Sequence, residues 1–290
     1  MRDVDERGIT ASVIERLEAT PDPRLRRIMT SLVRHLHDFV RDVELTEAEW
    51  ATAIDFLTRT GQACTGTRQE FILLSDTLGV SILVDALAHQ AGSGVTESTV
   101  LGPFYVEGAP ERANGADISA GLAGEPLFVE ASIAGRDGAA LAGATVDVWH
   151  SDDEGFYDVQ RPDRPGPALR ARFHADAAGR VRFWTIQPRS YPVPVDGPAG
   201  EMLRATGRHA FRPAHVHFRL AAPGHATLVT HIFAAGDAYL DSDAVFAVKQ
   251  SLIRDFTEQP PGTAPDGREL DRPWRRLEAA FVLAEAAPGA

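Results

Sequence analysis

The spacing of apolar residues changes near residue 100, and this change limits the fold to two regions of different architecture. Between residues 24 and 40, Leu25, Ile28, Met29, Leu32 and Leu36 recur at the three- or four-residue spacing of an amphipathic helix. Beyond residue 100 the apolar runs shorten, and Gly and Pro become frequent between them. Many short runs with such punctuation are typical of a β-sandwich or barrel. We therefore expect a mixed α and β chain, with a helical region at 1–99 and a β-sandwich with short flanking helices at 100–290.

Local signals predict where the individual elements lie. A capping-box pattern at Thr46 and Glu49 predicts the start of a helix, and further helices are expected at residues 71–78 and 80–87. Runs rich in β-branched and aromatic residues predict strands at 128–133, 145–149, 181–184, 215–220 and 227–233. A last helix is expected near residues 242–256, followed by a polar tail rich in Ala and Pro.

The composition excludes several classes of protein. A formal net charge of −12 over 290 residues argues against a nucleic-acid partner. No run approaches the roughly 18 apolar residues of a membrane span, and residues 1–10 lack the basic-then-apolar pattern of a secretory signal. Cys64 is the single cysteine, which excludes an intrachain disulfide and a thiolate metal cluster. A cytoplasmic location is the simplest expectation.

His215 and His217 stand two residues apart in a run that is expected to be a strand. Because strand side chains alternate between faces, both histidines point the same way and can bind one metal ion, while Val216 points to the other face. Arg212 would add a positive charge beside that ion. The pair alone leaves open a zinc site completed by a third ligand, and also packed strand histidines without any metal.

Tyr157 and Tyr191 are two of only four tyrosines, and both stand in loops beside the expected strands. Phenolate is a hard anionic donor and imidazole is a borderline one. Two of each would favour a trivalent cation, for which Fe(III) is the available candidate. A bound cation would also remove the phenol protons near pH 7, although the ordinary pKa of tyrosine is about 10.

The chain resembles the intradiol ring-cleaving dioxygenases over nearly its whole length. The matching motifs follow one another in order: Leu101-Gly102-Pro103-Phe104-Tyr105, Trp149-His150 with Tyr157 eight residues after Trp149, Pro188 with Tyr191, and Arg212-Pro213-Ala214-His215-Val216-His217. The resemblance implies one Fe(III) per subunit, with Arg212 as the active-site arginine. The ligands that it implies are Tyr157, Tyr191, His215 and His217.

Within that family the chain looks most like the hydroxyquinol branch. His231 stands where catechol-type enzymes usually have Gln, and Asp76 stands where they tend to have an apolar residue or Pro. The Asp76 carboxylate would accept a hydrogen bond from the third ring hydroxyl, which catechol lacks. The resemblance thus implies cleavage of hydroxyquinol (1,2,4-trihydroxybenzene) by O2 to 3-hydroxy-cis,cis-muconate, which tautomerises to maleylacetate. The residues that match ring-lining positions are Leu73, Val100, Pro103 and Phe104.

The hypothesised reaction gives three of these side chains a catalytic role. Tyr191 takes a proton from the substrate, Arg212 stabilises developing negative charge, and His231 orients the anionic system. The resemblance also implies a homodimer formed through the N-terminal helices, with a phospholipid bound in a hydrophobic tunnel. Catechol or chlorocatechol 1,2-dioxygenase activity is the nearest alternative, and a transthyretin-like binding module without catalytic metal is a more remote one.

Overall fold

The chain divides into two compact units, residues 1–59 and 60–290. The computed structural model describes residues 5–66, 68–89, 94–161 and 166–286. The first unit contains α1 (Ile9–Leu17), α2 (Pro23–Asp42) and most of α3 (Glu47–Gln62). The predicted capping box at the start of α3 is confirmed, because the Glu49 carboxylate accepts the Thr46 N–H and the Thr46 hydroxyl accepts the Glu49 N–H.

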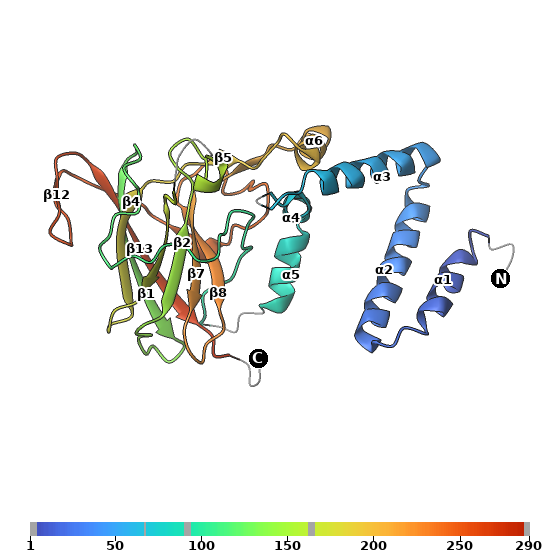
Figure 1. Ribbon diagram of the computed structural model, residues 1–290, viewed down its shortest axis with the longest axis horizontal. Helices are drawn as coiled ribbons and strands as arrows, with labels where there is room; N and C mark the ends of the chain where they lie inside the picture. Colours follow the sequence, from blue (N-terminus) through green and yellow to red (C-terminus); the bar gives the residue numbers. More distant parts are fainter. Residues whose placement is uncertain (1–4, 67, 90–93, 162–165, 287–290) are drawn as a thin grey trace. The chain divides into compact units, whose positions relative to one another are not determined.

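Two sheets pack face to face in the second unit (Figure 1). The strand orders are β10-β13-β1-β4 in one sheet and β3-β2-β7-β8-β9 in the other. Their bounds are β1 (Pro126–Gly135), β2 (Thr145–Trp149), β3 (Arg170–His174), β4 (Arg180–Ile186), β7 (His215–Ala221), β8 (Leu228–Ala234), β9 (Ile253–Arg254), β10 (Thr257–Gln259) and β13 (Trp274–Leu283). Apolar side chains from both inner faces form one buried cluster, so the predicted β-sandwich is confirmed.

Helices and short strands cover the outer face of the second sheet. These elements are α4 (Glu70–Thr77), α5 (Val80–Ala88), α6 (Pro198–Ala205), and the strand pair β5 (Tyr191–Pro192) and β6 (Phe211–Arg212). Leu73 of α4 and Leu203 of α6 share a buried cluster with Phe233 of β8. The remaining short elements are η1 (Asp158–Gln160), η2 (Gln250–Leu252), β11 (Gly262–Thr263) and β12 (Glu269–Leu270).

A buried carboxylate joins two of these helices. Glu70, which is 1% exposed, accepts the backbone N–H of Ala199 at 3.1 Å in the first turn of α6. The Arg68 guanidinium balances its charge at 2.8 Å. Negative charge is favourable at a helix N-terminus, so this contact fixes α4 against α6.

The prediction of a helix near residues 242–256 is wrong. Within this stretch the structure has only η2 and β9 as regular elements. The Asp243 carboxylate accepts the N–H groups of Val245 and Ala247, and Phe246 has a φ of +59° in the left-handed region. A side chain that binds nearby backbone N–H groups competes with helix formation, and a large residue rarely adopts positive φ within a helix.

The tail predicted beyond that stretch is also wrong, because residues 274–283 form β13 in the centre of the first sheet. β13 runs parallel to β1 and antiparallel to β10. Its buried positions alternate, and they include Leu277, Ala279, Phe281 and Leu283. The period-two signal was therefore present in the sequence, although Arg, Glu and Ala between these positions are poor indicators of a strand.

Among the described residues, no single helix is long and apolar enough to cross a membrane. Helices α4 and α5 reach the necessary length and apolar content only when they are taken together, and this pair is bent by 77°.

Replacement of Phe281 by Ala tests whether β13 belongs to the core. The Phe281 side chain is 1% exposed and lies 4.9 Å from the Phe218 ring of β7, centre to centre. We expect Phe281→Ala to lower the free energy of unfolding by about 3–5 kcal/mol, measured by chemical denaturation. The matched control is Ala280→Ser at the neighbouring exposed position, which should change it by less than about 0.5 kcal/mol. A negligible effect of Phe281→Ala, as for an unpacked tail, would contradict the strand.

Candidate metal centre and substrate pocket

Strand β7 presents His215 and His217 on the outer face of its sheet. Val216 and Phe218, which alternate with them, belong to the core between the sheets. Both histidines are nevertheless only 1% exposed, because loops and helices cover that outer face. The alternation expected from the sequence is therefore present, and it points both imidazoles into one buried space.

Two loops bring tyrosines to the same space. Tyr157 ends the loop after β2, where its N–H is accepted by the side chain of Gln160 and its ring stacks on Phe104 at 4.4 Å. Tyr191 begins β5, and Gly155 lies against it. A Cβ at position 155 would come within 2.5 Å of the Tyr191 Cβ, and Gly155 has a φ of +88°, so only glycine fits there without displacement.

Two phenol oxygens and two imidazole nitrogens converge. Tyr157 Oη lies 3.1 Å from Tyr191 Oη, 3.3 Å from His215 Nε2 and 3.0 Å from His217 Nε2. The two Nε2 atoms lie 3.1 Å from each other. The structure thus brings together the four side chains that the sequence indicated, although they come from positions 157 to 217.

Burial shifts the proton equilibria of all four groups towards their neutral forms. It raises the pKa of Tyr157 well above the ordinary value, with a further contribution from Tyr191, and it raises the pKa of Tyr191 despite the nearby Arg212 charge. Burial, together with nearby positive charge, lowers the pKa of His215 and of His217 far below the ordinary value. Neutral imidazoles keep a lone pair for a metal, and a cation would reverse the shift of the phenols.

Neighbouring groups orient the two imidazoles. The Nδ1 atom of His215 lies 2.7 Å from the Pro213 carbonyl oxygen, which can only accept, so the ring proton is on Nδ1 and the lone pair is on Nε2. The His217 ring stacks on Trp149 of β2 at 4.6 Å. Contacts of this kind typically set the ring orientation of metal-binding histidines.

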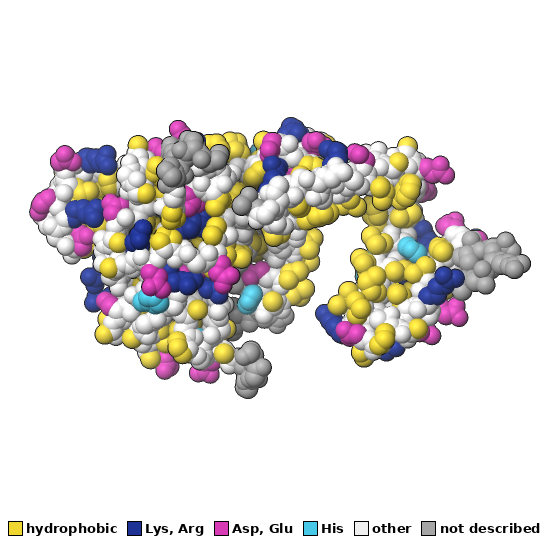
Figure 2. Space-filling view, in the orientation of Figure 1, with side chains coloured by type: hydrophobic (Ala, Val, Ile, Leu, Met, Phe, Trp, Pro, Cys, Tyr) yellow, Lys and Arg dark blue, Asp and Glu magenta, His cyan; other side chains and the backbone are white. Residues whose placement is uncertain are grey.

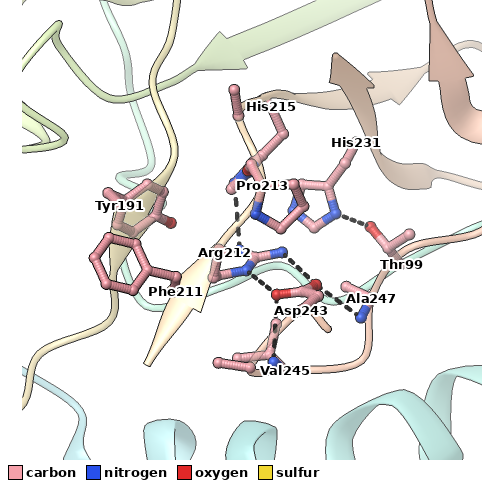
Figure 3. A network of polar contacts seen from close by, with 12 residues as sticks. Thr99, Tyr191, Phe211, Arg212, Pro213, His215, His231, Asp243, Val245 and Ala247 are labelled. Atoms are coloured by element: carbon pink, nitrogen blue, oxygen red, sulfur yellow. Dashed lines mark hydrogen bonds and ion pairs between the residues drawn. The ribbon is translucent and has the colours of Figure 1, made fainter. Parts of the chain in front are cut away.

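Arg212 is buried beside the four donors and is paired with Asp243. Its Nε and Nη2 atoms donate to the two carboxylate oxygens of Asp243 at 3.1 and 3.5 Å (Figure 3). Its Nη1 atom points the other way and lies 3.3 Å from His215 Nε2. Because Asp243 also accepts two backbone N–H groups, it holds the guanidinium in one orientation, with one edge facing the donors.

Three of the four expected ring-lining residues line a pocket beside the four donors. A pocket of about 630 Å³ is lined by Leu73, Pro103 and Phe104, together with Gly155 and Val193. The pocket borders two of the four donors, because its lining residue Phe104 stacks on Tyr157 and its lining residue Gly155 lies against Tyr191.

The other two expected pocket residues are not among those that line this pocket. Val100 is buried in one apolar cluster with Leu73. Asp76 is 3% exposed, and burial raises the pKa of its carboxyl, with an opposing effect from the Arg212 charge.

His231 completes a group of three buried histidines with His215 and His217. It lies on β8 directly across from His217, and one nitrogen from each of the three rings lies within 4.8 Å of the others. Its Nδ1 atom contacts the hydroxyl of Thr99, and its Nε2 atom has no hydrogen-bond partner among the described residues.

Sequence reasoning assigned no role to Asp243 or Thr99. Asp243 is 31 residues from Arg212, and Thr99 is 132 residues from His231. No local signal links partners at such separations. Two hints were present: Thr99 directly precedes the ring-lining Val100, and Asp243 ends the stretch from Gly236 that resembles the hydroxyquinol branch.

Comparisons with known proteins place this geometry among ring-cleaving enzymes. The "Dioxygenase" family model matches residues 100–272, and the model "Catechol dioxygenase N terminus" matches residues 22–96. A 6-chlorohydroxyquinol 1,2-dioxygenase of Cupriavidus pinatubonensis is 54% identical over 91% of this chain and 95% of its own length. A hydroxyquinol 1,2-dioxygenase of Nocardioides simplex is 50% identical over 97% of this chain and 96% of its own length.

A solved structure is similar to this chain both in sequence and in fold. The hydroxyquinol 1,2-dioxygenase of Pseudomonas putida DLL-E4 superposes with a TM-score of 0.89 at 47% identity. That comparison covers 97% of this chain and 99% of the other.

The pair of Arg212 and Asp243 can be tested through stability. Asp243→Asn keeps an acceptor for the backbone N–H groups but removes the charge that balances the buried guanidinium. We expect it to lower the free energy of unfolding of the metal-free protein by about 3–5 kcal/mol. Adding Arg212→Met should recover most of that loss, because no unpaired charge remains. An equal loss in the double variant, measured by chemical denaturation, would show that the pairing is not the cause.

Proposed function

Because this chain belongs to the intradiol ring-cleaving dioxygenases, we propose that it opens the ring of hydroxyquinol with O2 at an Fe(III) centre. The observation that carries the proposal is the convergence of Tyr157, Tyr191, His215 and His217 through contacts of 3.0–3.3 Å. Family membership removes the metal-free binding module from consideration.

The chemistry of the four donors fits Fe(III). Two hard phenolate oxygens and two imidazole nitrogens would supply two negative charges, and no thiolate or carboxylate is among them. Without a cation, burial favours the protonated form of both phenols. Only a strongly charged ion would convert them to the phenolates that complete the set of four ligands. Bound iron would supply a Lewis acid for the two adjacent oxygen atoms of the substrate and would make its ring reactive towards O2.

The surrounding side chains then act on the substrate. In its phenolate form, which a bound cation would favour, Tyr191 would accept a substrate proton at Oη. The Nη1 edge of Arg212, held by Asp243 beside His215, stabilises negative charge that develops on the substrate oxygens. Leu73, Phe104 and their neighbours hold the ring and exclude water.

The third hydroxyl decides between hydroxyquinol and catechol. We assign its recognition to Asp76, which is buried and lies close enough to Arg212 to interact with its charge. The names of the relatives at 50% and 54% identity support a hydroxyquinol as the substrate. Both oxygen atoms of O2 enter the product, 3-hydroxy-cis,cis-muconate, which tautomerises to maleylacetate.

A homodimer is part of the proposal, with residues 1–99 as the dimerisation region and 100–290 as the catalytic region. Along α2 apolar side chains are exposed (Figure 2), including Leu25 at 47%, Leu36 at 52% and Phe39 at 53%. Exposed apolar stripes of this kind are usually covered by a partner, here a second copy of the chain. A bound phospholipid and a cytoplasmic location stay predictions.

Iron content, colour and oxygen uptake test the proposed function together. We expect about one iron per chain, a red-brown colour from phenolate-to-Fe(III) charge transfer, and faster O2 uptake with hydroxyquinol than with catechol. Tyr157→Phe should lose iron and colour together, whereas Tyr239→Phe should keep both, because the Tyr239 ring stacks on Phe211 and its hydroxyl is not one of the four donors. A coloured, iron-replete Tyr157→Phe protein would refute the ligand set, and faster uptake with catechol would refute the substrate alone.

Removal of the Asp76 carboxylate tests the specificity. We expect Asp76→Ala to lower kcat/KM for hydroxyquinol about 10-fold to 100-fold and to change kcat/KM for catechol much less, because only hydroxyquinol loses a hydrogen bond to a charged group. For Asp76→Asn, which keeps an acceptor oxygen, kcat/KM for hydroxyquinol should lie between the values for the wild type and Asp76→Ala. Equal losses for both substrates in steady-state assays would assign Asp76 a structural role only.

A further inference from the structure

The role of His231 depends on which of its ring nitrogens carries the proton. One of its nitrogens lies within 4.8 Å of ring nitrogens of His215 and His217, so position alone would allow it to be a third imidazole ligand. A neutral imidazole has one N–H donor and one lone pair. His231 can therefore either bind a metal through Nε2 or donate a hydrogen bond from it, but not both.

Thr99 contacts the other nitrogen of the ring. The Thr99 Oγ1 atom lies 2.5 Å from His231 Nδ1, and Figure 3 shows the ring with Thr99 on one side and His215 on the other. Thr99 is 3% exposed and His231 is fully buried. The contact leaves Nε2 as the only free polar atom of His231, and it has no partner among the described residues.

The backbone holds the Thr99 hydroxyl in a fixed place beside β8. The Thr99 N–H donates to the Val229 carbonyl at 2.9 Å. The two residues before Thr99 are also held: the Ser98 carbonyl accepts a hydrogen bond from the Lys249 ammonium at 2.6 Å, and the Glu97 carbonyl accepts one from the Thr230 hydroxyl at 2.8 Å. Three attachments within three residues leave the hydroxyl little freedom to move away from His231.

The direction of the hydrogen bond follows from what else the hydroxyl can reach. Within the described part of the chain, His231 Nδ1 is its one hydrogen-bond partner. A buried O–H group without an acceptor is unfavourable. The arrangement that satisfies the hydroxyl has Thr99 donating to Nδ1, which leaves the ring proton on Nε2.

The neighbouring histidine shows the opposite arrangement. His215 Nδ1 faces the Pro213 carbonyl, an obligate acceptor, and its Nε2 faces Arg212 Nη1, an obligate donor. Both contacts require the proton on Nδ1 and a lone pair on Nε2. Two imidazoles of one cluster are therefore held in opposite tautomers by their outer partners.

We propose that Thr99 is a positioning residue that keeps His231 protonated at Nε2, so that His231 donates a hydrogen bond to an anionic oxygen of the substrate and does not bind the metal. The catalytic part of this proposal rests on the proposed function; the tautomer does not. The hydroxyl of Thr99 thereby determines that two imidazoles, and not three, are available as metal ligands.

Nitrogen-15 NMR of the metal-free protein tests the tautomer directly. The ring signals of His231 are assigned by their absence in His231→Leu. We expect a protonated Nε2 and an unprotonated Nδ1 in the wild type and in Thr99→Ser, which keeps the hydroxyl. In Thr99→Val, which has nearly the same shape without a donor, the preference should be lost. A protonated Nδ1 in the wild type would overturn the proposal, and this result does not require either Thr99 variant to fold.

Turnover in a double-mutant cycle tests the consequence. Thr99→Val should lower kcat for hydroxyquinol roughly 10-fold with little change in KM, and His231→Leu should lower kcat roughly 100-fold, as for loss of a transition-state donor. In the His231→Leu background, Thr99→Val should have almost no further effect, because no ring remains to position. Independent, multiplying losses would overturn the positioning role.

Iron content separates the remaining outcomes. His231→Leu should keep about one iron per chain with an unchanged visible band, and loss of iron would make His231 a ligand and overturn the proposal. A wild-type protein without iron or oxygen uptake would instead refute the proposed function, while the NMR result would still decide the tautomer.

Discussion

The alternation of side chains along β7 is the constraint on which both the core and the cluster of four donors depend. Val216, Phe218 and Leu220 fill the space between the two sheets, and this burial fixes which face the intervening residues occupy. His215 and His217 must then lie together on the outer face. A shift of one residue in the pairing of β7 would expose the apolar residues and turn both imidazoles into the core. The stability of the sandwich and the geometry of the site are therefore maintained by the same pairing.

Burial has a second effect, on charge. The covered outer face disfavours ionised groups, so its histidines are neutral and its tyrosines hold their protons more tightly than usual. Arg212 remains charged in this space because Asp243 accompanies it. The pair is fixed by backbone N–H groups of the irregular segment that follows Asp243, at the place where a helix was expected. This irregular segment therefore orients the Arg212 guanidinium through Asp243.

Local periodicity was sufficient to predict the helices and strands whose own apolar residues bury one face. Helices α2 to α5 and strands β1, β2, β4, β7 and β8 follow from it. It failed for β13, where Arg, Glu and Ala alternate with the core residues, and for the segment after Asp243, where one carboxylate competes with helix formation. The candidate donors were found because their order matched a family. Thr99 and Asp243 were missed because each acts on a residue far away in the chain.

By itself, the sequence determined the two-region architecture, the strand that carries both histidines, and the residue types able to bind a hard trivalent cation. Those properties depend on periodicity and on donor chemistry, which neighbouring residues express without reference to the rest of the fold. Only the tertiary structure decided which side chains meet: Tyr157 with Tyr191, Arg212 with Asp243, and Thr99 with His231. Hydrogen bonds are short and directional, so the proton arrangement of each buried group depends on partners that only the folded chain brings within reach.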